Sequence, residues 1–167
     1  MRTIDPSIRR PAGFTLLELL MVLAVIAILA LIALPSIQDR IVRDQIVEAA
    51  KLADIAKLRV AAAWTAAQAL PSDNGAAGLP AAEKMVGNFV QRVAVESGAV
   101  HLQFGNAANA ALKGRTLTWR PAVVPEAPVV PVAWVCGRAN APDKMTLKGL
   151  DKTDLPDRFL PMNCRKG

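Results

Sequence analysis

One acidic side chain, Glu18, stands alone in a long apolar stretch near the N-terminus. The segment from Phe14 to Leu34 has 21 residues, and Glu18 is the only charged one. As a helix it would be about 31 Å long, the thickness of a bilayer's hydrocarbon core. A carboxylate in hydrocarbon is costly unless it is paired or protonated. Either Glu18 lies close enough to the interface to stay hydrated, or a cation is brought to it.

The residues before this stretch offer such a cation. Segment 1–13 is basic and ends in Pro11-Ala12-Gly13, directly before the apolar run. Cleavage after Gly13 would create a charged α-amino group at Phe14. A plain signal peptide is the alternative, but its cleavage site would follow the apolar run, and no Ala-x-Ala-like site does. The basic flank favours a cytoplasmic N-terminus with the rest of the chain outside.

The remaining reactive side chains do not form an enzyme site. The chain has two cysteines, Cys136 and Cys164, and one histidine, His101. Their spacing matches no zinc or redox motif, and no nucleophile–His–acid set or phosphate-binding glycine loop is present. We therefore expect no enzyme, no cofactor and no metal. In an oxidising compartment a disulfide is the simplest interpretation, and closing its loop would stabilise the fold by about 3.6 kcal/mol.

The chain after the membrane segment predicts a helix over 36–70. Apolar residues recur every three or four positions and form one stripe. The stripe consists of Val42, Ile46, Ala49, Ala53, Ala56, Val60, Ala63, Ala67 and Leu70. The opposite, solvated face carries Arg43, Asp44, Lys51, Asp54, Lys57 and Arg59. We expect one helix from Phe14 to Leu70, kinked near Pro35 and ended by Pro71.

Beyond a linker of small residues (71–84), the pattern changes to the alternation of β-strands. Residues 93–95 and 100–104 alternate across Ser97-Gly98, which predicts a β-hairpin. Segments 117–119 and 132–136 continue the alternation. The prolines at 121, 125, 128 and 131 exclude a central strand between them. The predicted fold is α+β: a long N-terminal helix packed on a three- to four-stranded antiparallel sheet.

Segment 13–20 resembles the processing motif of type IV prepilins. Its residues are Gly13-Phe14-Thr15-Leu16-Leu17-Glu18-Leu19-Leu20. The resemblance implies that prepilin peptidase cuts after Gly13 and N-methylates Phe14, and that Glu18 pairs with a neighbouring subunit's terminal amine. Pro35 stands where the family has the proline that ends the membrane part of its helix. One departure is Ala27, where the family commonly has a glycine.

The C-terminal segment carries a second, independent resemblance. Residues 134–137 (Trp-Val-Cys-Gly) and 160–165 (Leu-Pro-Met-Asn-Cys-Arg) are similar to the ends of the disulfide-bounded loop of major type IV pilins. This resemblance implies a Cys136–Cys164 bridge. The expected organisation is a leader (1–13), a transmembrane and assembly helix (14–35), an amphipathic helix (36–70) and a globular head (71–167) with the disulfide loop 136–164.

The function expected from both resemblances is structural. The chain would wait in the bacterial inner membrane and then polymerise, as a homo-oligomer, into an extracellular pilus for adhesion, twitching motility or DNA uptake. Its partners would be prepilin peptidase and the pilus assembly machinery. A minor pilin, a type II secretion pseudopilin and, from another class, a membrane-anchored binding module are the alternatives. The net charge of +6 serves solubility or, alternatively, a weak and salt-sensitive affinity for DNA.

Overall fold

The structure is a computed structural model that describes residues 13–166, apart from the side chains of residues 33–36. The predicted leader therefore lies outside the described residues, except for Gly13. The contacts divide the chain into two units, one ending at Gln38 and the other beginning at Asp39.

The N-terminal element is one helix, α1, over Leu16–Ala67. It begins two residues later than predicted, because the Thr15 hydroxyl oxygen accepts the backbone N–H of Glu18 at 3.2 Å and caps the helix. It ends three residues before Leu70, because Gln68 has a left-handed backbone with a φ of 51°. The helix assignment is continuous through Pro35, and the kink expected there stays a prediction.

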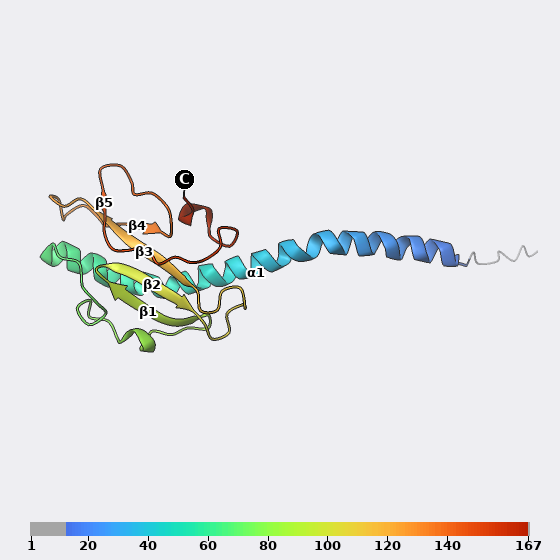
Figure 1. Cartoon of the computed structure of the whole chain (residues 1–167), viewed down its shortest axis with the longest axis horizontal. Coiled ribbons are helices and arrows are strands. Elements are labelled where there is room, and N and C mark those ends of the chain that lie inside the picture. Colours follow the sequence, from blue (N-terminus) through green and yellow to red (C-terminus); the bar gives the residue numbers. More distant parts are fainter. Residues whose placement is uncertain (1–12, 167) are drawn as a thin grey trace, which may run out of the picture. The chain divides into compact units, whose positions relative to one another are not determined.

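Four antiparallel strands form the sheet in the order β1-β2-β3-β4. Their bounds are β1 Val90–Glu96, β2 Ala99–Phe104, β3 Thr116–Val123 and β4 Ala133–Cys136. A short fifth strand, β5 (Thr146–Leu147), pairs with β3. Figure 1 shows the sheet lying along the part of α1 that follows Gln38. The predicted long helix and antiparallel sheet are confirmed, while β5 was not predicted.

The β1–β2 hairpin has the predicted turn. Val95 pairs with Val100 and Val93 with Leu102. Ser97 and Gly98 between the strands have φ angles of 47° and 82°. Positive φ at both positions is typical of a type I′ turn, whose twist matches that of the flanking strands.

Pro121 corrects the prediction that the prolines exclude a central strand. Pro121 lies inside β3, which is paired on both edges, and opposite Trp134 of β4. In an antiparallel strand the N–H and C=O of one residue face the same edge. The Pro121 carbonyl accepts the N–H of Lys148 at 2.9 Å, so its missing N–H faces that edge too. The β2 pairing there has already ended at Trp119. Among the described residues the edge is covered only by the end of the short β5, so the missing N–H costs at most the one return bond to Lys148.

The core lies between α1 and the sheet. The predicted helix stripe is buried from Val42 to Val60, with exposed fractions of at most 3%. Beyond Val60 the prediction holds only in part. Trp64 is buried instead of Ala63 and Ala67 is exposed, whereas Leu70 is half-buried and packs against the core. A seven-residue repeat drifts against the helical period of 3.6 residues. By the third repeat this drift turns Trp64 toward the core.

Two 3-10 turns complete the fold, η1 over Ala82–Lys84 and η2 over Met162–Cys164. The segment that leads into η2 has little regular structure, yet it is well packed. Leu155, Phe159 and Leu160 are each at most 3% exposed and belong to the main core cluster. The C-terminal segment is therefore part of the folded head.

Candidate functional site

The residues before Gln38 expose apolar side chains without a core to bury them. Phe14, Leu16 and Leu31 are each at least 74% exposed. One window of α1 has a mean hydropathy of 3.0, and none of it is buried inside the chain. A helix that is apolar all round is stable only in lipid or against other protein. This segment therefore needs a partner from outside the chain.

Gly13 and Phe14 lie just before α1, outside any helix or strand. A Cβ atom at Gly13 would meet no atom of the described chain within 4 Å, and its φ is not in the left-handed region. The fold of the chain therefore gives no steric reason for glycine at this position. Any requirement for glycine at position 13 therefore comes from another molecule that binds this segment.

Glu18 lies in the first turn of α1. Its backbone N–H is bound by Thr15, but its side chain is exposed and has no ion pair among the described residues. The partial positive charge of the helix N-terminus stabilises a carboxylate in this position only modestly. The carboxylate is left free for a partner supplied by another molecule.

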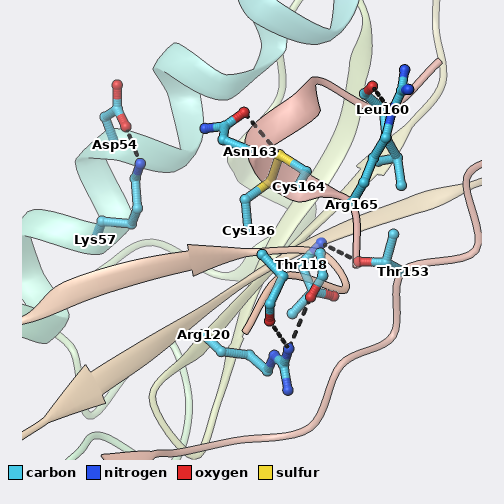
Figure 2. Close-up of a disulfide and its surroundings, with 12 residues drawn as sticks. Asp54, Lys57, Thr118, Arg120, Cys136, Thr153, Leu160, Asn163, Cys164 and Arg165 are labelled. Carbon is cyan, nitrogen blue, oxygen red and sulfur yellow. Dashed lines mark hydrogen bonds and ion pairs between the residues drawn. A yellow bond between two sulfur atoms is a disulfide. The ribbon is translucent and has the colours of Figure 1, made fainter. Parts of the chain in front are cut away.

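The C-terminal loop is closed by the predicted disulfide. Cys136 at the end of β4 is bonded to Cys164 in η2, and both residues are almost fully buried. Figure 2 shows the bridge with Arg120 and Thr118 of β3 below it and Asp54 and Lys57 of α1 beside it. The prediction of this bridge is confirmed.

The backbone next to the disulfide packs closely. Gly137 has a φ of 54°, and a Cβ atom there would lie 2.7 Å from the carbonyl oxygen of Cys164. That oxygen accepts the N–H of Arg138 at 2.9 Å, and Gly137 donates its own N–H to the Thr118 carbonyl at 2.8 Å. Only glycine fits this position without displacing the loop.

Arginine side chains fasten the loop to the rest of the head, which the sequence did not reveal. Arg43 of α1 donates to the Arg158 carbonyl at 2.7 Å, although the sequence placed Arg43 on a purely solvated face. Arg120 of β3 donates to the Gly137 carbonyl at 2.9 Å. Arg138 pairs with the Asp157 carboxylate within the loop itself. Sequence gives no periodic signal for such contacts, because they join segments far apart in the chain.

Comparison with known protein families assigns this architecture. The profile of the pilin family, described as a bacterial filament protein, matches residues 42–165, most of the chain. The chain belongs to the pilin family. It is thus a structural subunit of a bacterial filament. A second profile, the prokaryotic N-terminal methylation motif, matches residues 8–34 of this pilin, the segment that contains Gly13, Phe14 and Glu18.

Curated relatives span nearly the whole pilin. A fimbrial protein of Neisseria meningitidis serogroup B is 32% identical over 163 residues, which cover 92% of this chain and 93% of the relative. The type IV major pilin protein PilE of Neisseria gonorrhoeae is 32% identical over 160 residues, with the same coverage. Another gonococcal type IV major pilin protein, PilE1, is 33% identical over 160 residues, and the match covers 92% of this chain and 86% of that relative.

Proposed function

We propose that this pilin is cut between Gly13 and Phe14 by prepilin peptidase, N-methylated on Phe14 and polymerised into a type IV pilus. Before assembly, segment 14–35 holds it in the inner membrane, with the leader in the cytoplasm and the head, 71–167, in the periplasm. After assembly the same apolar surface is covered by neighbouring subunits in an extracellular fibre. The observation that carries the proposal is an apolar helical segment, none of it buried inside the chain, joined to a disulfide-closed head.

The mature N-terminus tests the processing step directly. We expect mass spectrometry of sheared filaments to find a chain that begins at Phe14, with one methyl group on its α-amine and two hydrogens missing for the disulfide. A chain that retains the leader, or one cut beyond the apolar segment, would exclude prepilin processing. The result separates a pilin from an ordinary membrane-anchored binding module, which has no reason to carry a methylated phenylalanine.

Glu18 has the assembly role in this proposal. Its carboxylate has no ion pair within the described chain, and cleavage creates a cation four residues away, at Phe14. A neighbouring subunit that is shifted along the fibre brings its own Phe14 amine to this carboxylate. Removing one partner of a buried ion pair costs about 3–5 kcal/mol, so the pair selects one axial stagger. Pro35, at the end of the proposed membrane segment, marks where the helix leaves this apolar environment.

The Glu18 role is tested by the ratio of sheared filament to membrane-bound pilin. Glu18→Ala should be inserted and cleaved normally but assemble poorly, and Glu18→Asp should be intermediate because its carboxylate is one methylene shorter. Asp44→Ala is the matched control, since Asp44 is an exposed acid on the same helix. An unchanged ratio for Glu18→Ala, or an equal loss for Asp44→Ala, would show that Glu18 does not register subunits.

The major subunit is favoured over a minor pilin or a pseudopilin. The relatives that cover 92% of the chain are named as major pilins or fimbrial proteins, and the chain has the closed C-terminal loop. Deleting the chain should therefore abolish the filaments. Filaments that persist in its absence would identify a minor subunit. The same deletion strain would reveal whether adhesion, twitching motility or DNA uptake depends on the fibre.

A further inference from the structure

The segment after α1, which the sequence predicted only as a linker of small residues, covers one edge of the sheet. β1 is the end strand in the order β1-β2-β3-β4, so β2 is its only partner strand among the described residues (Figure 1). At the hairpin turn, the backbone N–H groups of Ser97 and Gly98 donate to the carbonyls of Ser72 and Pro71 at 3.1 and 2.9 Å. An open edge strand is a template for pairing with another chain. Segment 71–80 covers the hairpin end of this edge.

Asn74 holds the same segment to β1 through its side chain. Its Nδ2 donates to the Val93 carbonyl at 3.0 Å, and its Oδ1 accepts the Val95 N–H at 2.6 Å. Nδ2 also donates to the Pro80 carbonyl at 2.9 Å, within the segment itself. Asn74 is buried, with an exposed fraction of 7%. Its carboxamide thus makes the two bonds to β1 that the backbone of a neighbouring strand would make.

The orientation of the Asn74 amide is fixed by its partners. A backbone N–H can only donate and a backbone carbonyl can only accept. The amide oxygen therefore faces Val95, and the nitrogen faces Val93 and Pro80. A carboxylate in this place would keep the bond from Val95, but it would bring an oxygen without a hydrogen against two carbonyl oxygens. A carboxamide fits this edge and a carboxylate does not.

Asn74 is also the one asparagine of the chain that is followed by a glycine, Gly75. This dipeptide favours deamidation, because the next backbone nitrogen must reach the side-chain Cγ and glycine has no side chain to hinder the approach. The Gly75 nitrogen bonds to Asn74 Cγ while the Cγ–Nδ2 bond breaks, and Nδ2 leaves as ammonia with the Gly75 amide proton. Water then opens the cyclic imide at either carbonyl, to aspartate or isoaspartate, without oxidation or reduction.

The folded head opposes this reaction. The Asn74 amide must give up its three bonds to Val93, Val95 and Pro80 before its carbon can join Gly75, so segment 71–80 has to lift from β1 first. Each such hydrogen bond shifts the equilibrium by a factor of about 2 to 12. Losing three of them therefore makes the open form rare, and deamidation should be slower in the folded head on the order of 100-fold.

We infer that Asn74 is a deamidation site that is closed while segment 71–80 covers β1 and that reacts when this segment lifts. The product carries a carboxylate, which cannot bond the Val93 and Pro80 carbonyls, so the segment no longer closes over β1. An isoaspartate also adds a carbon atom to the main chain. Opening of the head is thereby made irreversible, and the edge of β1 stays uncovered. Neither the site nor its chemistry depends on filament formation.

Mass spectrometry of peptides from full-length pilin tests the site. The protein is incubated at mildly alkaline pH in an uncharged detergent, either folded or in guanidinium. In guanidinium Asn74 should undergo the amide-to-acid exchange well before the other asparagines, and folding should slow its conversion on the order of 100-fold. Gly75→Ala should lose this lead in guanidinium, because its methyl group hinders cyclisation. Equal rates in the folded and unfolded chain, or no lead of Asn74 in guanidinium, would overturn the inference.

Hydrogen exchange tests the consequence of the modification. Asn74→Asp carries the carboxylate of the product, and amides of the peptide that contains β1 should exchange on the order of tenfold faster. Asn109→Asp is the matched control, because the Asn109 side chain is exposed and uses its Oδ1 to accept the Ala111 N–H at 2.9 Å, a bond that a carboxylate keeps. Equal exchange in the two variants would contradict the closing role of the amide.

Refolding gives the same information if Asn74→Asp does not fold. Unmodified pilin that has partly deamidated in guanidinium is returned to native buffer, and the fraction that regains slow exchange in β1 is separated. This fraction should contain Asn74 and be depleted of its aspartate and isoaspartate products. A refolded fraction as rich in these products as the starting mixture would show that the carboxylate does not prevent closure.

Discussion

Gly137 is the position where a single methyl group should be most informative about the C-terminal loop. Gly137→Ala adds a Cβ atom 2.7 Å from the carbonyl oxygen of Cys164. That carbonyl cannot withdraw freely, because its own residue is bonded to Cys136, the neighbour of Gly137. The carbonyl also holds the N–H of Arg138. Relief of the clash therefore displaces a disulfide-linked segment and weakens a backbone hydrogen bond.

The expected loss of stability has two separable parts. A left-handed backbone costs an alanine about 1–2 kcal/mol relative to glycine. The clash and the displaced hydrogen bond add about 1–3 kcal/mol. Gly114→Ala isolates the first part, because Gly114 has a φ of 76° but no atom within 4 Å of its Cβ position. Gly137→Ala should therefore be clearly more destabilising than Gly114→Ala.

Guanidinium unfolding of full-length pilin in detergent measures this difference. All three tryptophans lie in the unit that begins at Asp39, so their fluorescence reports on the head. With a slope near 3 kcal/mol per molar, Gly137→Ala should lower the midpoint by about 1 M and Gly114→Ala by roughly half as much. Equal midpoints for the two variants would refute the steric argument. A midpoint of Gly137→Ala equal to that of the unmodified protein would refute both parts of it.

Three further predictions concern processing, the disulfide and pH. Gly13→Val should leave an uncleaved precursor in the membrane, seen as a larger band on an immunoblot, while Ala24→Val, with a similar added volume in the apolar helix, should be cleaved. Cys164→Ser should destabilise the head by about 3.6 kcal/mol and lower filament yield without affecting cleavage; free thiols in mature, unmodified pilin would contradict it. Burial lowers the pKa of His101 from its usual 6.5, so as the pH falls the unfolded chain is protonated at His101 before the folded chain is. The free energy of unfolding should therefore fall as the pH drops below about 6.5, by up to about 1.4 kcal/mol per pH unit. The hydrogen bond from Lys152 lowers the pKa of Glu96 from 4.5, so the stability that this carboxylate contributes should be present above that pH and be lost below it. His101→Gln should abolish only the fall in stability that begins near pH 6.5. Denaturation at a series of pH values would resolve the two falls.

Periodic features were predictable from the sequence because each repeat adds to the same signal. The buried stripe from Val42 to Val60 follows from apolar spacing alone, and the hairpin follows from alternation on both sides of Ser97-Gly98. The ends of α1 were less predictable, since one cap at Thr15 and one left-handed residue at Gln68 decide them. A cap or a single left-handed residue occurs once, so it adds no periodic signal to the sequence.

Pro121 shows why a correct rule gave a wrong prediction. Proline does remove a ladder hydrogen bond, but at Pro121 the facing edge carries only the end of the short β5, so the loss is at most one bond. Whether β2 still runs beside β3 at that point depends on how far the neighbouring strand extends, which the proline itself does not indicate. The arginine contacts to loop carbonyls were missed for a similar reason, because they depend on which segments meet in space. The neighbours of His101 were missed likewise, because they come from three strands and a loop that meet only in the folded head.

Two glycines of this pilin separate the requirements of the chain from those of its partners. Gly137 must be glycine because the chain's own atoms occupy the space around it. Around Gly13 the described chain is open, and Glu18 has no ion pair within it. The fold is therefore equally consistent with many other residues at 13 and 18. If these two residues are needed, the need arises outside the single chain. In our proposal a peptidase recognises Gly13, and a neighbouring subunit neutralises Glu18. Substitutions of Gly13 or Glu18 should stop processing or assembly and leave the unfolding midpoint of the head unchanged. Substitution of Gly137 should lower that midpoint. This contrast distinguishes residues required by other molecules from a residue required by the fold.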